Sequence, residues 1–255
     1  MSERISVYWL GYANDVDNPR GLTDIPAEVS IINLAFAVTC PSSEGDSITM
    51  DFLTSQHSRD EIVAGIRYLH ARGQKVCMSI NGNPNWPDHP GGWVNLNPVE
   101  FARNVKRIAI DEWSCDGIDL DNEANETPDD HFCQVIRELR TALGPDAIIS
   151  LPVYLGLSRD KYLANVVPEI SYVATMAYWN DYQSQIDLLL EYASVLTPEK
   201  VYIGVANAAN PGQCTDLAIV PQLAQYQPKG GLMLWTANFK DALQWISAMS
   251  GISVV

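Results

Sequence analysis

The sequence is poor in basic residues: lysine and arginine together number 16, against 31 aspartates and glutamates, which gives a formal net charge of −15. This excess of negative charge repels the phosphates of nucleic acids and the headgroups of anionic membranes. We therefore expect no nucleic acid partner and no membrane partner, and favour a neutral or cationic small molecule. An acidic composition is also typical of an ordinary soluble surface.

Long apolar segments are also missing. No run approaches the roughly 18–20 apolar residues of a membrane-spanning helix. The first residues, MSERISVYWLGY, lack the basic start and apolar stretch of a signal peptide. We therefore expect a cytoplasmic location for the chain as written, or secretion if a leader was trimmed or export is unconventional.

Cysteine is scarce and widely spaced. The five cysteines form no CxxC pair and show no zinc-type spacing with histidine, and the four histidines suggest no metal site of their own. No glycine-rich phosphate loop follows the first strand-like run. The sequence therefore predicts no disulfide scaffold, and we expect no metal and no cofactor.

Strand-like runs alternate with helical patterns along the whole chain. Most of the runs are nearly continuous valine, isoleucine, leucine and alanine, as in parallel strands buried on both faces. Helix starts are marked by a capping box from Ser58 to Glu61 and by cap–proline pairs at 97–98 and 127–128. An apolar stripe predicts a last helix over 240–249. The strand-like runs are 5–12, 29–38, 74–81, 115–123, 147–154, 170–179, 200–207 and 231–235.

Eight such alternations within 255 residues predict an α/β fold of the (β/α)8 TIM barrel type, with an open doubly wound sheet as the alternative. The first connection, 13–28, reads mostly as loop. No linker or repeat divides the chain, so we expect residues 1–255 to form a single catalytic domain. Only about 20 residues separate the seventh and eighth runs, which leaves no room for an α+β insertion there.

The fourth run ends in DGIDLDNE, which puts three carboxylates on one face of a strand. Residues two apart share a face, so Asp119, Asp121 and Glu123 project together, while the isoleucine and leucine between them point the other way. The acids then face the barrel interior near the carboxyl ends of the strands, where barrel active sites form. Their repulsion pushes their pKa values apart, and a protonated Glu123 beside an ionised aspartate suits a general acid.

Two other interpretations of this cluster remain. Clustered carboxylates also suit Mg²⁺ or Ca²⁺, although the glycine that a calcium loop needs at its sixth position is missing. A structural ion-pair network would need basic partners, and the strand-like runs contain only Lys75 and Lys200, both at their starts.

DGIDLDNE resembles, at every fixed position, the D-G-x-D-x-D-x-E signature of glycoside hydrolase family 18, the chitinases and endo-β-N-acetylglucosaminidases. INLAFA (32–37), MAY (176–178) and GGLMLW (230–235) are similar to this family's second, sixth and eighth strands. The resemblance thus spans nearly the whole predicted barrel.

The resemblance implies a role for each matched acid. Glu123 would protonate the glycosidic oxygen. Asp121 would hold the substrate's own 2-acetamido group, which attacks the anomeric carbon and gives an oxazolinium intermediate. Asp119 would share charge and a proton with Asp121, and Asp116 would buttress the strand or contact substrate. Substrate assistance of this kind predicts net retention.

Other matched residues would contact the sugar. Tyr178 would hydrogen-bond the acetamido group, and Trp235 would form the floor beneath the reacting sugar. Alternation puts Met176 and Asn180 on the same face as Tyr178. The family often has an aspartate after the tyrosine, whereas Trp179 stands here, and we expect Asn180 to supply the polar contact instead.

A second departure follows the third strand-like run, where the family often has S-x-G-G. Here SING places Asn81 at the first glycine, beside the predicted sugar site. Trp86 and Trp93 lie in a proline- and glycine-rich loop on the predicted rim. Their rings are candidates for stacking on sugars, with packing over the barrel mouth as the alternative.

We therefore expect a monomeric glycosidase, chitinase-like, that cleaves β-1,4 linkages next to N-acetylglucosamine in an oligosaccharide or polysaccharide such as chitin. The first alternative is an endo-β-N-acetylglucosaminidase that acts on the chitobiose core of N-glycans. The others are a catalytically silent, lectin-like barrel and a metal-dependent barrel enzyme. Lectin-like members of this family commonly lose the terminal acid, whereas Glu123 is present.

Overall fold

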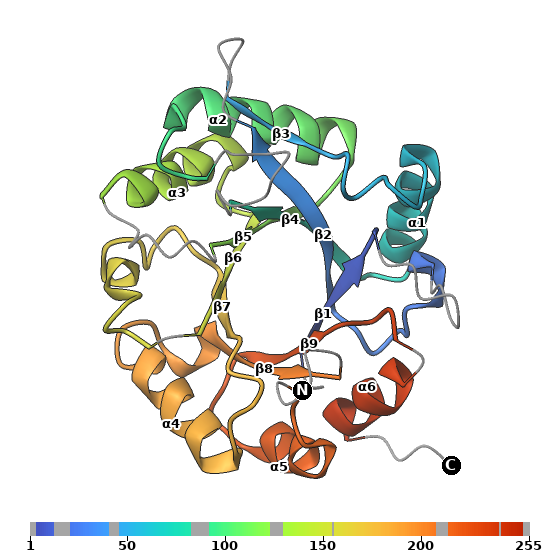
Figure 1. The fold of residues 1–255 in the computed structure, drawn as a ribbon, viewed down its shortest axis with the longest axis vertical. Coiled ribbons are helices and arrows are strands. Elements are labelled where there is room, and N and C mark those ends of the chain that lie inside the picture. Colours follow the sequence, from blue (N-terminus) through green and yellow to red (C-terminus); the bar gives the residue numbers. More distant parts are fainter. Residues whose placement is uncertain are drawn as a thin grey trace.

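Eight parallel strands close into a barrel, and helices surround it (Figure 1). The computed structural model describes residues 4–12, 21–40, 46–82, 92–122, 130–154, 156–207, 214–239 and 241–251. Two predicted site residues, Glu123 and Trp86, lie outside these ranges, as does the predicted helix cap at 127–128.

Each barrel strand coincides with one of the eight strand-like runs of the sequence, although β2 extends two residues beyond its run, to Cys40. The first strand pairs in parallel with both the second and the last, so the sheet closes on itself and the alternative of an open doubly wound sheet is excluded. The strands are β1 (Ile5–Leu10), β2 (Ile31–Cys40), β4 (Lys75–Asn81), β5 (Gly117–Asp121), β6 (Ile148–Val153), β7 (Tyr172–Thr175), β8 (Val201–Ala206) and β9 (Gly231–Trp235).

Helices cover the outside of this ring, and two of them begin at caps that the sequence predicts. The Ser58 hydroxyl accepts from the Glu61 amide at 3.3 Å, and the Glu61 carboxylate accepts from the Ser58 amide at 2.8 Å, which confirms the capping box. The Asn97 side chain accepts from the two amides at the second and third helical positions, as predicted. The helices are α1 (Arg59–Ala71), α2 (Pro98–Val105), α3 (Asp130–Leu143), α4 (Tyr182–Ala193), α5 (Val220–Gln225) and α6 (Ala242–Ser250).

Three local features differ from the prediction or refine it. A short strand, β3 (Ser47–Thr49), pairs antiparallel with the end of β2 and was not predicted, because three residues carry no periodic pattern. A π-helical segment, Lys106–Glu112, prolongs α2. Between β8 and β9, the described residues form a 3-10 turn and α5 but no strand, in keeping with the expected lack of an α+β insertion.

Side chains alternate between two apolar layers on either side of the barrel wall. Ile118 and Leu120 of β5 are fully buried in the layer between strands and helices. A second cluster fills the interior, where the rings of Tyr172 and Tyr202 stack with centroids 4.2 Å apart. Gly117 lets β5 approach its neighbour, because a Cβ there would come within 2.1 Å of a carbonyl oxygen of β6. This alternation sends the odd-numbered residues of β5 inward.

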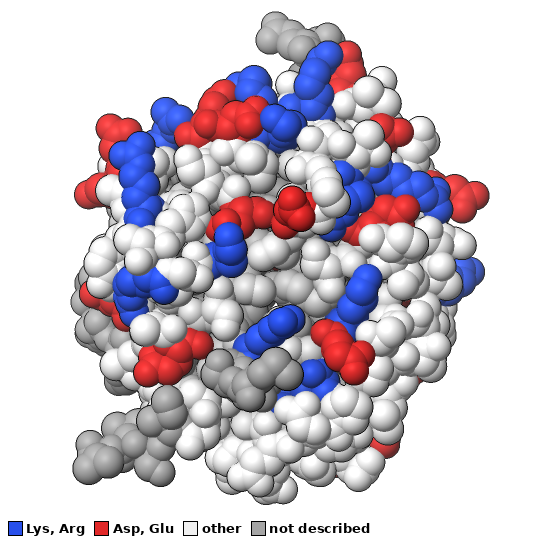
Figure 2. All heavy atoms as spheres, turned by 180° about the vertical axis from the view of Figure 1, so that it is seen from behind, with Lys and Arg blue, Asp and Glu red and all other residues white. Residues whose placement is uncertain are grey.

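None of the described helices is long and apolar enough to cross a membrane. Seen from behind (Figure 2), acidic and basic side chains are interspersed, so the net negative charge does not form one continuous acidic surface on this face.

Asp116 lies at the amino end of β5, where it ties three elements together. Its carboxylate accepts from the Lys75 ammonium at 2.7 Å and from the Val76 amide at 2.9 Å, and it lies 2.7 Å from the His70 ring nitrogen. Partial burial raises the pKa of Asp116, but the bonds from Lys75, Val76 and His70 outweigh it, and the pKa lies below its usual value. The ionised form is therefore the one that stabilises the fold.

We expect Asp116→Asn to lower the free energy of unfolding by about 1–3 kcal/mol at neutral pH, because a partly buried charged acceptor is lost. Since the pKa of Asp116 is depressed in the folded state, the stabilisation is present above the unfolded-state pKa, about 3.9, and is lost as the pH falls below it. Urea unfolding of both proteins between pH 2.5 and 8 measures this difference. The matched control is Asp111→Asn, whose exposed pair with Lys106 contributes at most about 1 kcal/mol; equal losses in the two variants would contradict the assignment.

Candidate active site

Asp119 lies inside the barrel, held by hydroxyl groups from three other strands. Its Oδ2 accepts from the Tyr8 hydroxyl of β1 at 2.8 Å and from the Ser79 hydroxyl of β4 at 2.7 Å. Its Oδ1 accepts from the Ser150 hydroxyl of β6 at 2.7 Å. Only 1% of Asp119 is exposed. The inward orientation is the one that strand alternation predicts, but the three partners could not be read from the sequence.

Burial dominates the electrostatics of this carboxyl group. It raises the pKa of Asp119 to about 6, although the hydrogen bonds from Ser150, Ser79 and Tyr8 act in the opposite direction. The pKa of Tyr8 is raised well above its usual value by burial and by the charges of Asp119 and Asp121. Tyr8 therefore stays neutral and remains a donor at any working pH, while Asp119 exchanges a proton near neutrality.

Asp121 lies two residues further along β5, at its carboxyl end. The parallel register places it opposite Asn81 of β4, whose side-chain amide donates to Asp121 Oδ2 at 2.9 Å. Both side chains are buried, with 2% of Asp121 and 4% of Asn81 exposed. Asn81, which departs from the family's S-x-G-G pattern, thus contacts Asp121 of the DGIDLDNE motif directly.

An aromatic and apolar surface lies beside the two aspartates. Met176, Tyr178 and Trp235 all pack against the interior cluster and are partly buried. The Trp235 ring lies 5.3 Å from that of Tyr8 and 5.9 Å from that of Phe36, centroid to centroid. The structure thus brings together the residues expected to form the floor and the acetamido pocket.

The remaining predicted site residues are not part of this aromatic surface or lie outside the described ranges. Asn180 is partly buried just before α4, and its contact with sugar stays a prediction. Trp179 beside it is half-exposed. Asp116 lies at the opposite end of β5 and is engaged by protein groups, so we assign it to buttressing and not to substrate contact. The roles of Glu123 and Trp86 also stay predictions, since both lie outside the described ranges.

Trp93 is a packing residue, and the prediction that it stacks on sugar is wrong. Only 4% of it is exposed, and its ring lies 6.1 Å from Phe101 and 5.2 Å from Phe132 between barrel and helices. It presses against Gly82 so closely that a Cβ there would come within 2.1 Å of the indole nitrogen. A ring enclosed in this way has no face left for a sugar.

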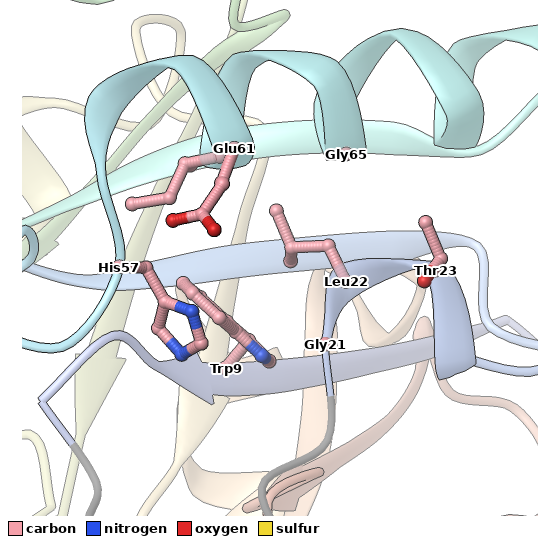
Figure 3. Close-up of a pocket in the computed structure, with 8 residues that line it drawn as sticks. Trp9, Gly21, Leu22, Thr23, His57, Glu61 and Gly65 are labelled. Atoms are coloured by element: carbon pink, nitrogen blue, oxygen red, sulfur yellow. The ribbon is translucent and has the colours of Figure 1, made fainter.

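A hollow of about 220 Å³ opens on the outside of the barrel wall, between β1 and the start of α1 (Figure 3). Trp9 points into it and packs against His57, with ring centroids 5.0 Å apart. Because neighbours on a strand face opposite ways, Trp9 lies outside and Tyr8 inside the barrel. Within the described ranges, no group of three histidine, cysteine or acidic side chains is placed to hold a metal ion.

Residues 8–214 match the family model of the endo-β-N-acetylglucosaminidase EndoS TIM-barrel domain. The chain belongs to this family. The resemblance to glycoside hydrolase family 18, the family of chitinases and endo-β-N-acetylglucosaminidases, is thereby confirmed.

Known relatives agree with this assignment. A protein of Arthroderma benhamiae named "probable class II chitinase" is 26% identical over 172 residues, which are 60% of this chain and 46% of that protein. The chain thus spans about half of that relative's length. A family GH18 chitinase from Chromobacterium violaceum shares the fold, with a TM-score of 0.76 and 17% identity over 98% of this chain and 83% of that one. An endo-β-N-acetylglucosaminidase from Cordyceps militaris also shares it, with a TM-score of 0.66 and 20% identity over 98% and 91% of the two chains.

The raised pKa of Asp119 leads to a prediction for its carboxyl signal. In a titration followed by ¹³C NMR, Asp119 changes protonation near pH 6, whereas Asp116 in the same spectra changes below its usual range. The pKa of Asp119 is higher in the folded state than in the unfolded state. Protonation of Asp119 therefore stabilises the fold at low pH, and this stabilisation is lost as the pH rises from about 3.9 towards 6. A midpoint near 4 for Asp119 would contradict the burial argument.

The packing role of Trp93 leads to a stability prediction. We expect Trp93→Ala to lower the free energy of unfolding by about 3–5 kcal/mol, the usual loss when a large aromatic core residue is truncated. Trp179→Ala, which removes a half-exposed ring, is the control and should cause a much smaller loss. Denaturant unfolding of both variants measures the difference, and a Trp93 variant of nearly normal stability but weakened sugar binding would restore the stacking hypothesis.

Proposed function

We propose that this chain is a retaining glycosidase that cleaves β-1,4 linkages next to N-acetylglucosamine, with the substrate's 2-acetamido group as the nucleophile. The observation that carries the proposal is the pair of buried aspartates at the carboxyl half of β5, beside Tyr178 and Trp235, in a chain of the EndoS barrel family. This pair lies at the end of the barrel where barrel active sites form.

The residues divide the chemistry among them. Asp121 accepts the acetamido N–H and so turns the carbonyl oxygen towards the anomeric carbon, while Tyr178 donates to that oxygen. Glu123, assigned from the sequence motif, protonates the leaving oxygen and then deprotonates the attacking water. Trp235 supports the apolar face of the sugar. Substrate assistance of this kind is a known exception to the usual pair of catalytic carboxylates.

Asp119 acts as a proton reservoir next to Asp121. Its pKa of about 6, set by burial, lets it take up or release a proton near neutral pH, when the charge on Asp121 changes during the reaction. Two adjacent anions in a buried site are unfavourable, so one proton shared by the pair lowers the repulsion.

Chitin-type oligosaccharides are our first candidate substrate. The described part of the connection from β8 to β9 adds one short helix and no strand, and so no extra wall to the cleft. We therefore expect a shallow, open groove there, which would favour cleavage within a chain or next to a bulky group. The second candidate is the chitobiose core of N-glycans, which is favoured by the match to the EndoS barrel model.

The deciding experiment is a product assay on two substrates, each with and without EDTA. One reaction contains soluble N-acetylglucosamine oligomers and the other a high-mannose glycopeptide. We expect the wild type to cleave at least one of the two substrates, with retention of the anomeric configuration. The substrate that is cleaved decides between the two candidates. We expect Glu123→Gln to lower turnover by at least ~10²-fold, the lower limit of a general acid's usual share.

Asp121→Asn should lower turnover comparably, because the acetamido group loses its anionic partner. The control is Glu28→Gln, which changes an exposed glutamate in the turn before β2, at the amino ends of the strands, and should leave turnover unchanged. Near-normal turnover in either site variant would refute the mechanism. Sugar binding without cleavage by the wild type would favour the lectin-like alternative. Loss of activity when EDTA is added would favour a metal-dependent enzyme.

A further inference from the structure

The two aspartates of β5 have different kinds of hydrogen-bond partners. Asp119 is surrounded by three hydroxyl groups, each of which can donate to a carboxylate or rotate to accept from a carboxylic acid. Asp121 instead faces the amide nitrogen of Asn81, at 2.9 Å from Oδ2. An amide N–H₂ donates only. The hydroxyl groups around Asp119 can therefore serve either protonation state, whereas the Asn81 amide favours the ionised form of Asp121.

The geometry of the Asn81 contact is set by the backbone. Asn81 and Asp121 are direct partners in the β4–β5 ladder, and the Gly82 amide donates to the Asp121 carbonyl at 3.2 Å. Only 4% of Asn81 is exposed. A hydrogen bond from the Asn81 amide is stronger to the ionised carboxylate of Asp121 than to a neutral carboxylic acid. The contact therefore resists protonation of Asp121.

Several other titratable groups of the described residues lie on the barrel strands around the pair. On β4, Lys75 lies at the amino end and pairs with Asp116. Burial raises the pKa of several interior groups far above neutrality, so they stay uncharged: Tyr8 of β1, Cys77 of β4 and Tyr172 of β7. Tyr178, in the segment after β7, packs against the interior cluster, and Glu123 follows β5 on the chain.

We infer that Asn81 is a positioning residue, which holds Asp121 as the carboxylate and so leaves the shared proton on Asp119. This inference rests on the proposed function, in which an ionised Asp121 orients the acetamido group. It also gives a chemical reason for the asparagine that replaces the glycine of the family's S-x-G-G pattern. Asn81 acts through Asp121, without a bond of its own to the reacting atoms.

The test combines a titration with kinetics on Asn81→Leu and Asn81→Gly. Loss of the donor destabilises the charged form of Asp121, so in ¹³C NMR its carboxyl midpoint should rise by about one pH unit while that of Asp119 falls. The acid limb of the kcat profile should move to higher pH by the same amount, with a smaller change in KM. If Asn81→Leu does not fold, Asn81→Gly takes its place in both measurements. The matched control is Asn104→Ala, which removes a hydrogen bond from the side-chain amide to the Asp46 carbonyl outside the barrel. This variant should leave the titration midpoints of Asp119 and Asp121 unchanged.

The titration does not depend on activity, so the two hypotheses fail separately. Unchanged aspartate midpoints in a folded Asn81 variant overturn the positioning role, even if the wild type is active and the proposed function stands. An acid limb that stays in place while kcat falls equally at all pH values also overturns it. Shifted midpoints in a wild type that cleaves neither substrate support the Asn81 contact and overturn the proposed function instead.

Discussion

The burial of Asp119 is the constraint on which the rest of the site depends. A carboxyl group taken out of water is destabilising by several kcal/mol unless other groups hydrogen-bond it. Here the compensating hydroxyls come from β1, β4 and β6, so the acid is accommodated only when the barrel has closed around it. Even so, burial keeps the pKa of Asp119 at about 6. The interior thus tolerates a destabilised group at its centre, as active sites commonly do.

The two ends of β5 use acids in opposite ways. At the amino end, Asp116 meets Lys75 and His70, and its lowered pKa marks a group that stabilises the fold. Towards the carboxyl end, Asp119 and Asp121 contact hydroxyls and an amide and lie beside aromatic rings. The same residue type therefore stabilises the fold where the Lys75 ammonium is near, and has the chemical role that we propose where its partners are neutral hydroxyl and amide groups. This polarity matches that of barrels in general, whose active sites form at the carboxyl ends.

Sequence reasoning recovered the frame of this molecule because its signals are local. Eight apolar runs predicted eight strands, the Ser58 capping box predicted the start of α1, and strand alternation predicted which face of β5 points inward. What it missed depends on contacts between distant segments. The hydroxyl partners of Asp119 come from strands that only the closed barrel brings together, and the enclosure of Trp93 depends on α2 and α3 packing over it. The strand β3 was missed for another reason, since three residues are too few to show a period.

The pairing of Asn81 with Asp121 has a consequence for how this barrel can diversify. Both residues belong to adjacent strands in fixed register, so their contact is part of the sheet itself and does not depend on the loops above it. Loops tolerate insertions and exchange far better than strands do. Under the proposed function, the reacting centre and the loops that would select the glycan are therefore separable parts, and the loops could be exchanged for a new glycan while the acid–amide pair below stays unchanged.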